Sequence, residues 1–282
     1  MTRIAHIILP NASEYERKLQ RIDQAALAGS HEVVVVPLSE VSASGAEVAH
    51  VYASAELPPA AFVRFPIPYL ASAALPRSRW PLLRSLRRPV APRFVVSPLA
   101  EQAGEEHLTL LPEAVDERWF EAAATRLEAS RRDVRIVGSF ARPSTRNFFE
   151  QTVARIERFR SDVRWQLFSH APSPEDLAGV DAWVDPAVRP DDLDGFTAEA
   201  LVLGLPIVAT RMPINVLRLE QGRTGLLVPA GDPNEMTHAI LAILFKPEVA
   251  ESKRNAARQT VSKFRPRPRL RRLTELVESL IS

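Results

Sequence analysis

The chain has 282 residues, of which 46% are hydrophobic and 25% charged, a balance typical of a globular protein with enough apolar side chains for two cores. It contains no cysteine, which excludes disulfide bonds, thiol catalysis and cysteine-ligated metal sites. The net charge is only +2, and the short apolar run at the N-terminus turns polar at once, so no secretion signal or membrane span is visible and we expect a cytoplasmic protein.

The first fifty residues predict a strand, a helix and two further strands. Residues 4–9 are apolar and predict a buried strand, and Ser13 with Glu16 three residues later predicts a capping box that begins a helix. Residues 32–38 and 47–53 predict the second and third strands. Because a helix joins the first two strands, we expect a parallel sheet in an α/β domain.

Residues 58–92 are rich in proline, and the segment 77–93 carries arginines with no acidic residue among them. Trp80 and several leucines interleave with these arginines, a pattern typical of an interfacial segment or of a rim that binds phosphate. A solvated irregular loop is the alternative. A nucleic-acid contact is disfavoured because no stacking platform or helix-turn-helix pattern accompanies the charges. The arginines are Arg77, Arg79, Arg84, Arg87, Arg88 and Arg93.

The chain then alternates strands and helices to its end. Residues 94–97 and 107–111 predict the last strands of a first domain, and residues 117–130 predict a linking helix. A strand and an amphipathic helix over 134–159 open a second domain. Further strands are expected over 164–169 and 182–186, further helices over 234–245 and 249–263, and a final helix over 270–281 after the prolines of 265–269. The predicted parts are therefore 1–120, 121–265 and a C-terminal helix in 266–282.

Residues 191–210 (DDLDGFTAEALVLGLPIVAT) contain the strongest candidate site. Asp194 is a suitable N-cap for a helix over 195–203, and Gly204 stands where a glycine often ends a helix. Residues 205–210 form an apolar run, as a strand buried on both faces of a parallel sheet requires.

The start of that helix predicts an anion site. The backbone N–H groups of Gly195, Phe196 and Thr197 have no partner within a helix that begins there, so a phosphate fits against them. Asp191 and Glu199 are eight residues apart and flank this position. Because carboxylates accept hydrogen bonds from hydroxyl groups, the pair suits a sugar ligand.

A set of ordered motifs follows from this point: Asp191, Glu199–Ala200, 204–210, 224–228 (TGLLV) and 231–233 (GDP). Together they resemble the C-terminal signature of the retaining glycosyltransferases of the GT-B fold, especially glycosyltransferase family 4. That family has two acidic residues eight apart, a Glu-Ala pair, a Gly-Leu-Pro-Val-Val-Ala-Thr-like strand, a Thr-Gly-Leu-Leu-Val turn and a Gly-Asp-Pro. The resemblance covers the C-terminal half well and the N-terminal half in outline.

The resemblance implies two Rossmann-like α/β domains facing each other across a cleft, both shorter than usual in the family. It also implies a hexosyltransferase that moves a sugar from a nucleotide-sugar donor to an acceptor with retention, without a metal or a separate cofactor. Asp191 and Glu199 would be the catalytic pair, with Asp191 on the donor sugar and Glu199 on the ribose. The amides of Gly195 and Phe196 would hold the diphosphate.

Several positions depart from the family pattern. Where relatives hold the diphosphate with an Arg and a Lys, Ser139 replaces the Arg, whereas Arg146 stands for the Lys with Arg142 nearby. The family's Gly-Gly-x-x-Glu loop is replaced by residues 213–217, in which Asn215 is the only polar side chain. The resemblance therefore implies that Asn215 contacts the donor. These departures leave open an inactive nucleotide-sugar-binding or interaction protein of the same fold.

The sequence also permits different chemistry on the same fold. A sugar-nucleotide epimerase shares this fold, but no acid and base pair is evident. Asp192 and Asp194 form an Asp-x-Asp of the kind that binds metal in the other glycosyltransferase fold, yet a helix cap explains Asp194. His50 resembles a strand-end histidine of the family, although a histidine among apolar residues is more often a core residue, and His170 is more often an ordinary loop residue.

The acceptor is the part of the function that the sequence describes least. The arginines of 77–93 suit an anionic acceptor or the inner face of a membrane, where each basic residue contributes about 1 kcal/mol near anionic lipid. The sequence does not indicate an oligomeric state.

Overall fold

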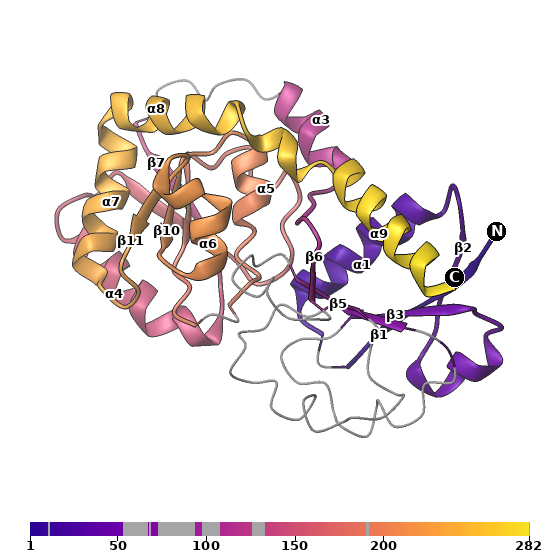
Figure 1. The fold of residues 1–282 in the computed structure, drawn as a ribbon. Helices are drawn as coiled ribbons and strands as arrows, with labels where there is room; N and C mark the ends of the chain where they lie inside the picture. The colour runs from indigo at the N-terminus through magenta and orange to yellow at the C-terminus, as the bar shows by residue number, and fades with distance from the viewer. Residues whose placement is uncertain are drawn as a thin grey trace. The chain divides into compact units, whose positions relative to one another are not determined.

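The computed structural model describes residues 1–10, 12–52, 67, 69–72, 94–97, 108–125, 133–189 and 192–281. The chain forms two compact units, unit 1 with Met1–Ala114 and Arg265–Ser282, and unit 2 with Val115–Phe264 (Figure 1). Unit 2 begins at Val115, and Trp119 packs into its core. No helix within the described ranges is long and apolar enough to cross a membrane.

Unit 1 contains one parallel sheet whose strands lie in the order β2-β1-β3-β4-β5-β6. The expected parallel sheet is therefore confirmed. The strands are β1 (Arg3–Ile8), β2 (Glu32–Val35), β3 (Val48–Tyr52), β4 (Tyr69–Ser72), β5 (Phe94–Ser97) and β6 (Leu108–Leu110). Among its described residues, the helices are α1 (Glu14–Leu27), the 3-10 helix η1 (Leu38–Ala43) and α9 (Pro266–Ile281).

The predicted capping box begins α1. The carboxylate of Glu16 accepts a hydrogen bond from the backbone N–H of Ser13 at 2.9 Å and another from its hydroxyl group. This fixes the point at which the chain turns from β1 into the helix.

The C-terminal helix α9 belongs to unit 1, where it packs against α1 and β3 (Figure 1). Leu273 and Val277 of α9 lie in one core cluster with Ile4, Val48 and Leu27, so α1 and α9 cover the same face of the sheet. A separate cluster that includes Ile7, Val41 and Val51 covers the other face. Both faces of these strands are buried, which explains their continuous apolar runs.

Unit 2 also contains one parallel sheet, with the strand order β11-β10-β9-β7-β8. The strands are β7 (Arg135–Phe140), β8 (Val163–Phe168), β9 (Ala182–Asp185), β10 (Ile207–Thr210) and β11 (Leu226–Val228). The α-helices are α3 (Glu117–Thr125), α4 (Arg146–Glu157), α5 (Thr197–Val202), α6 (Pro213–Arg218), α7 (Pro233–Phe245) and α8 (Pro247–Arg258). The 3-10 helices are η5 (Pro143–Thr145), η6 (Glu220–Gly222) and η7 (Val261–Phe264).

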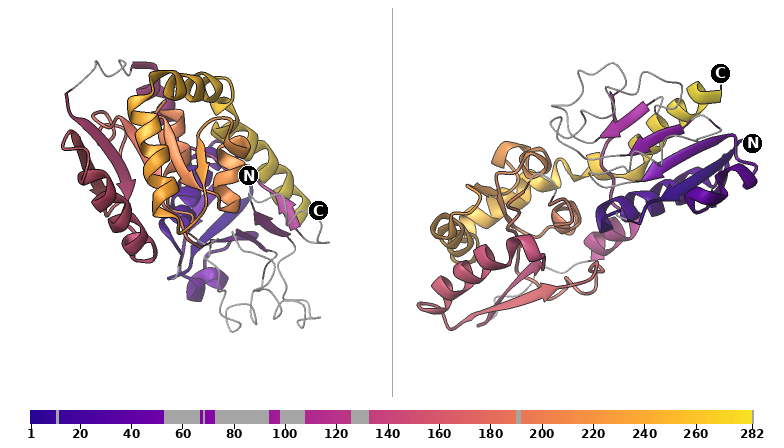
Figure 2. Two further views of the ribbon diagram at one scale, coloured as in Figure 1. Left: turned by 90° about the vertical axis from the view of Figure 1, so that its left-hand side faces the viewer. Right: turned by 90° about the horizontal axis from the view of Figure 1, so that it is seen from below.

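Two core clusters sandwich the sheet of unit 2. Trp119 of α3, Ala198 of α5 and Phe264 of η7 belong to the first cluster. Phe149 of α4 and Ile240 of α7 belong to the second, and α4 and α7 pack against each other. The orange and yellow helices of this unit are seen from a second side in the left view of Figure 2.

Four expectations about local structure need correction. Strand β4 was not predicted from the sequence, and it lies inside the proline-rich segment 58–92. Residues 213–218 form the helix α6 rather than a loop. The final helix begins at Pro266, because prolines are tolerated in a first helical turn, where their missing N–H groups have no partner in any case. The helix expected over 195–203 is shorter, spanning Thr197–Val202.

Candidate functional site

The candidate site lies in unit 2 at the carboxyl ends of β7, β9 and β10. Strand β8 is added to one side of β7, and β9, β10 and β11 are added to the other side. The order of the strands therefore reverses between β7 and β9, which makes this a topological switch point. Ligands of open α/β sheets bind outside the carboxyl ends of the strands at such a reversal. Residues 192–196, which follow β9 and lead into α5, are called the signature loop below.

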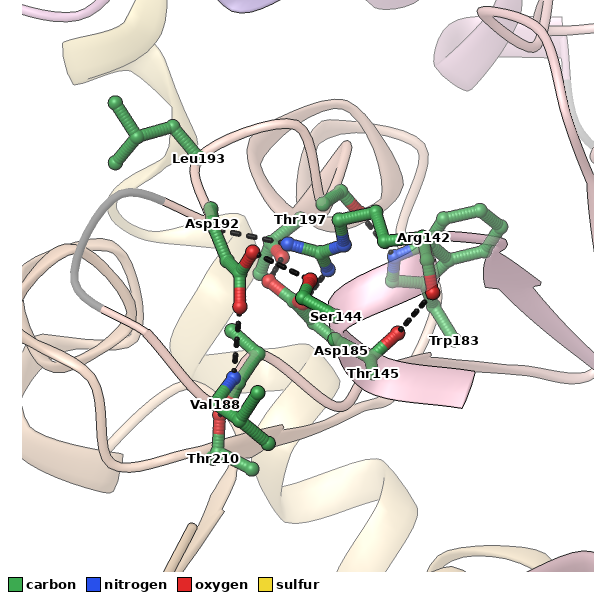
Figure 3. A network of polar contacts seen from close by, with 12 residues as sticks. Arg142, Ser144, Thr145, Trp183, Asp185, Val188, Asp192, Leu193, Thr197 and Thr210 are labelled. Carbon is green, nitrogen blue, oxygen red and sulfur yellow. Dashed lines mark hydrogen bonds and ion pairs between the residues drawn. The ribbon is translucent and has the colours of Figure 1, made fainter. Parts of the chain in front are cut away.

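A buried ion pair forms the centre of this site (Figure 3). Asp185 is the last residue of β9, and its carboxylate accepts hydrogen bonds from the guanidinium of Arg142 and, at 2.8 Å, from the hydroxyl of Thr197. Arg142 also donates to the carbonyl oxygen of Asp192 at 2.8 Å. Asp185 and Arg142 are both buried, and Arg142 Nε has no hydrogen-bond partner among the described residues.

The charge of Asp185 is stabilised by two arginines. Burial alone would raise the pKa of its carboxyl group, but the Arg142 guanidinium, the Thr197 hydroxyl and the charge of Arg218 together hold the pKa below its usual value. Arg218 lies in α6 and donates to the carbonyl oxygen of Leu193 at 3.2 Å. Two cations and one carboxylate therefore meet beside the signature loop.

Asp192 fixes the signature loop from within. One of its carboxylate oxygens accepts from the hydroxyl of Ser144 at 2.7 Å, and the other accepts from the backbone N–H groups of Val188 and Arg189 at 3.0 and 2.9 Å (Figure 3). These three hydrogen bonds occupy both oxygens of its carboxylate. Over the described ranges, no three His, Asp or Glu side chains lie close enough together to hold a metal ion.

Gly195 is required by the protein's own packing. A Cβ atom at this position would clash with the carboxylate of Asp185. The carbonyl oxygen of Gly195 accepts a hydrogen bond from the indole of Trp183 at 2.7 Å. The side chain that approaches this glycine closely is therefore that of Asp185.

The start of α5 differs from the expected one. Phe196, not Asp194, is the N-cap residue, and it adopts a left-handed conformation with φ of +50°. Such a conformation is costly for a bulky residue and is held here because Thr197 is bound to Asp185 and Gly195 to Trp183. Strained backbone of this kind clusters at ligand sites.

The other predicted residues lie at different depths. Glu199 is 1% exposed within α5, and Asn215 is fully buried within α6. Arg146 is exposed at the first turn of α4, so it is accessible to a ligand whereas Arg142 is not. Asp191 and the arginine segment 77–93 lie outside the described residues. The structure therefore brings Arg142, Gly195, Phe196 and Thr197 together.

Two residues of the site were not predicted from the sequence. Asp185 could have been identified from the sequence, because it is an acidic residue that ends an apolar strand immediately before a proline in AWVDP. No sequence pattern identifies Arg218 as a site residue, because a single arginine in a short helix resembles any solvent-facing charge.

His50 of unit 1 is a core residue with both ring nitrogens occupied. Its Nε2 lies 2.7 Å from the hydroxyl of Ser72, and its Nδ1 lies 2.8 Å from the hydroxyl of Tyr52. Burial holds its pKa well below the usual value. His170 of unit 2 is exposed after β8.

Comparisons with known proteins match part of the chain to a family and the whole chain to a fold. Residues 111–245 match the family model described as glycosyl transferases group 1. A search of curated proteins found no match.

Solved structures show a similar fold over the whole chain. A glycosyltransferase from Rickettsia africae has a TM-score of 0.74 at 11% identity, covering 100% of this chain and 99% of that one. Sucrose-phosphate synthase from Thermosynechococcus elongatus has 0.73 at 14% identity, covering 99% of each chain. Anabaena Alr3699/HepE, in complex with UDP and glucose, has 0.72 at 15% identity, covering 99% and 100%.

Proposed function

We propose that this chain, which has the GT-B fold and matches the glycosyl transferases group 1 in residues 111–245, moves a sugar from a nucleotide-sugar donor to an acceptor. The observation that carries the proposal is the polar cluster at the carboxyl ends of β7, β9 and β10, which lies within the matched residues. HepE, which has a similar fold, is known in complex with UDP and with UDP-glucose, which supports a donor of this class.

Each candidate residue has a role that suits its chemistry. Glu199 would accept hydrogen bonds from the ribose, and Asp191 from the donor sugar. The backbone N–H groups of Gly195 and Phe196, with the exposed guanidinium of Arg146, would hold the diphosphate. Asp185 keeps the signature loop in place by binding Arg142 and Thr197.

In the reaction, an oxygen of the acceptor attacks the anomeric carbon of the donor sugar. The bond from that carbon to the phosphate oxygen breaks, the nucleoside diphosphate leaves, and the acceptor's proton passes to the leaving phosphate. We propose that this occurs on one face of the sugar, with retention. Arginine side chains and backbone N–H groups stabilise the negative charge that develops on the leaving group, so the proposed mechanism needs no metal ion or covalent enzyme intermediate.

The arginine segment 77–93 is the basis for a proposal about the acceptor. We propose that the acceptor is an anionic molecule or lies on an anionic membrane surface. Vesicle sedimentation tests this part alone. We expect binding to anionic and not to neutral vesicles, with affinity that falls steeply as salt is added. Changing Arg84, Arg87 and Arg88 together to Ser should abolish that binding without changing nucleotide affinity. Salt-insensitive binding, or none, would contradict the membrane proposal.

Turnover is the direct test of the transferase. The protein is incubated with UDP-glucose, other UDP-hexoses and GDP-mannose, and mass spectrometry follows the release of nucleoside diphosphate and the fate of the sugar. We expect slow hydrolysis of one donor even without an acceptor. The Glu199→Gln variant is the control for contaminating enzymes and should release at least ten times less.

A binding protein without catalysis is the second candidate, and specific observations favour it. Ser139 stands where family members carry an arginine, and Arg142 is paired with Asp185 rather than exposed to a ligand. Leu217 is 43% exposed where relatives have a carboxylate. Tight nucleotide-sugar binding with no turnover of any donor would establish this second function.

A further inference from the structure

One buried carboxylate ties two loops of unit 2 together (Figure 3). The loop after β7 contributes Ser144, whose hydroxyl donates to Oδ1 of Asp192 at 2.7 Å. The loop after β9 contributes the backbone N–H groups of Val188 and Arg189, which donate to Oδ2 of the same carboxylate at 3.0 and 2.9 Å. Asp192 is only 6% exposed, so its side chain is used within the protein and is not offered to a ligand.

The same residue holds the loop after β7 at a second point. The backbone carbonyl oxygen of Asp192 accepts a hydrogen bond from the guanidinium of Arg142 at 2.8 Å. Arg142 is the N-cap residue of η5, Ser144 lies within η5, and α4 begins directly afterwards at Arg146. The backbone N–H of Thr145 donates back to the carbonyl oxygen of Arg142 at 3.2 Å. The chain just before Arg146 is therefore fixed to the loop after β9.

Arg146 is the residue of this loop that can meet a ligand, because it is exposed whereas Arg142 is buried. It occupies the first position of α4, whose first turn contains no acidic residue and whose N-cap makes no side-chain hydrogen bond. A cation at the positive end of a helix is unfavourable unless an anion lies nearby. The donor diphosphate, which Arg146 is proposed to hold, supplies that anion.

Asp192 is not suited to touch the diphosphate itself. A carboxylate and a phosphate both carry negative charge, so they repel each other. Both also offer only hydrogen-bond acceptors, so neither can donate to the other. Any effect of Asp192 on the donor must therefore pass through the groups that it holds in place.

We propose that Asp192 is a positioning residue, which ties the loop after β7 to the loop after β9 and thereby presents Arg146 to the donor diphosphate. This inference rests on the proposed nucleotide-sugar function. An arginine side chain loses conformational freedom when it binds a ligand, and a fixed backbone lowers that cost. The tie through Ser144 should therefore increase affinity for the diphosphate only while Arg146 is present.

A double-mutant cycle tests the inference. Calorimetry measures the affinity for UDP, or for GDP if that nucleotide binds the wild type, in the wild type, Ser144→Ala, Arg146→Ala and the double variant. Ser144→Ala removes the tie to Oδ1 of Asp192, and we expect a roughly 3- to 10-fold weaker affinity in this variant. In the Arg146→Ala background the same change should have no further effect, because the group that the tie presents is absent.

Asp192→Asn tests whether the geometry or the charge matters. The amide oxygen can accept from the two backbone N–H groups, and the amide nitrogen can donate to the Ser144 hydroxyl, so the tie is kept. We expect an affinity within about twofold of the wild type, or a tighter one, because a negative charge near the phosphates is lost. An affinity as weak as that of Ser144→Ala would contradict positioning by geometry.

Ser173→Ala is the matched control. Its hydroxyl also ties an aspartate within unit 2, since it accepts from the backbone N–H of Asp176 at 3.3 Å in the loop after β8. This variant should bind the nucleotide like the wild type. Melting curves of all the variants establish that each one is folded, and if Ser144→Ala is not, Ser144→Gly takes its place in the cycle.

The outcomes separate this inference from the proposed function. A wild type that binds neither UDP, GDP nor their sugar conjugates contradicts the proposed function. A wild type that binds, together with a Ser144→Ala variant of equal affinity, overturns only the role of Asp192. An equal loss on Ser144→Ala with and without Arg146 would show that the tie acts only on the fold, and it would also overturn the inference.

Discussion

Each unit of the protein contains a buried Asp–Arg ion pair, and the two pairs are completed to different degrees. In unit 1, Arg269 Nε donates to Asp23 Oδ1 at 2.6 Å and Nη2 donates to Oδ2 at 2.7 Å, while a third nitrogen donates to Pro112 O at 3.0 Å. In unit 2, a single nitrogen of Arg142 contacts Asp185, and Arg142 Nε has no partner in the described ranges. The unit 1 pair is therefore saturated, whereas the unit 2 pair leaves a buried N–H group of Arg142 unpaired within those ranges.

The environment of the unit 1 pair is also fully arranged. The Tyr52 hydroxyl donates to Asp23 at 2.8 Å, so it must accept from His50 Nδ1–H, and the neutral ring then accepts at Nε2 from the Ser72 hydroxyl. The donor and the acceptor of each hydrogen bond in this network are therefore fixed. The network joins α1, β3, β4 and α9, which indicates that its role is to fix the C-terminal helix.

Breaking the unit 1 pair should have the largest effect. Changing Arg269 to Ala leaves the Asp23 carboxylate buried without its cation, and loss of one partner of a buried pair costs roughly 3–5 kcal/mol. Urea denaturation measures the loss, and hydrogen exchange should show the protection of α9 falling first. Arg272→Ala removes an exposed ion pair with Glu275 in the same helix and should cost at most about 1 kcal/mol. Similar values for both variants would contradict the structural role of the pair.

Acid should weaken unit 1 through His6. Burial lowers its pKa from 6.5 to about 4, while Asp23 opposes and Arg269 assists this shift, and His50 and Tyr52 face the same ring. Below pH 6.5 the unfolded chain takes up a proton that the folded chain refuses until about pH 4. The contribution of His6 to the free energy of unfolding is therefore fully present above pH 6.5 and falls by about 3 kcal/mol as the pH is lowered to about 4.

The variant His6→Gln tests this assignment, because glutamine does not titrate and can still pair with Gln20, which lies 3.3 Å from the histidine ring. Urea denaturation of both proteins between about pH 7 and pH 4.5 gives the two slopes. The variant should lose clearly less stability on acidification than the wild type. Equal slopes would show that other groups cause the acid sensitivity.

The unit 2 pair should tolerate a change better. Asp185→Asn keeps side-chain oxygen and nitrogen atoms beside Arg142 and Thr197 but removes the charge, and we expect a loss of about 1–3 kcal/mol. In addition, a diphosphate bound at the signature loop should partly compensate the charge of the two buried arginines without contacting them, so UDP should raise the melting temperature of this variant at least as much as that of the wild type. A loss as large as that of Arg269→Ala, with no rescue by UDP, would make the two pairs equivalent.

The smallest effect on stability is expected at Arg146, which is exposed at the first turn of α4. Arg146→Ala should change the free energy of unfolding by at most about 0.5 kcal/mol and should weaken UDP binding about tenfold, because a charge-assisted contact to the diphosphate is lost. Arg158→Ala, at the other end of the same helix, is the control. Equal UDP affinity in the two variants would remove Arg146 from the proposed site.

The sequence predicted the local features of the fold and missed the distant ones. Residues 205–210 predicted the strand that β10 forms, because a run buried on both faces has no polar position. Ser13 with Glu16 predicted a helix start, because the two partners are three residues apart. Ion pairs carry no such signal. Arg142 and Asp185 are 43 residues apart, and Asp23 and Arg269 are 246 apart.

The same limit explains the errors at the candidate site. Asp194 is a suitable cap by local chemistry, but the contact from Thr197 to Asp185 on a neighbouring strand sets the start of α5 at Phe196 instead. The role of Gly195 also depends on Asp185, which only the fold brings beneath it. Thr197 and Glu199 could be named from the sequence because their motif is continuous.

Calorimetric titration of the wild type and of Glu199→Gln with UDP and UDP-glucose, extended to GDP and GDP-mannose, tests the central claim that unit 2 binds a nucleotide sugar. Glu199 is buried within α5, so the nearly isosteric glutamine should preserve the fold, which equal melting temperatures would establish. The account predicts that the wild type binds one of these nucleotide sugars and that Glu199→Gln binds it at least tenfold more weakly, whereas Glu157→Gln on an exposed position of α4 does not differ from the wild type. Absence of binding, or equal binding by the wild type and Glu199→Gln, would contradict it.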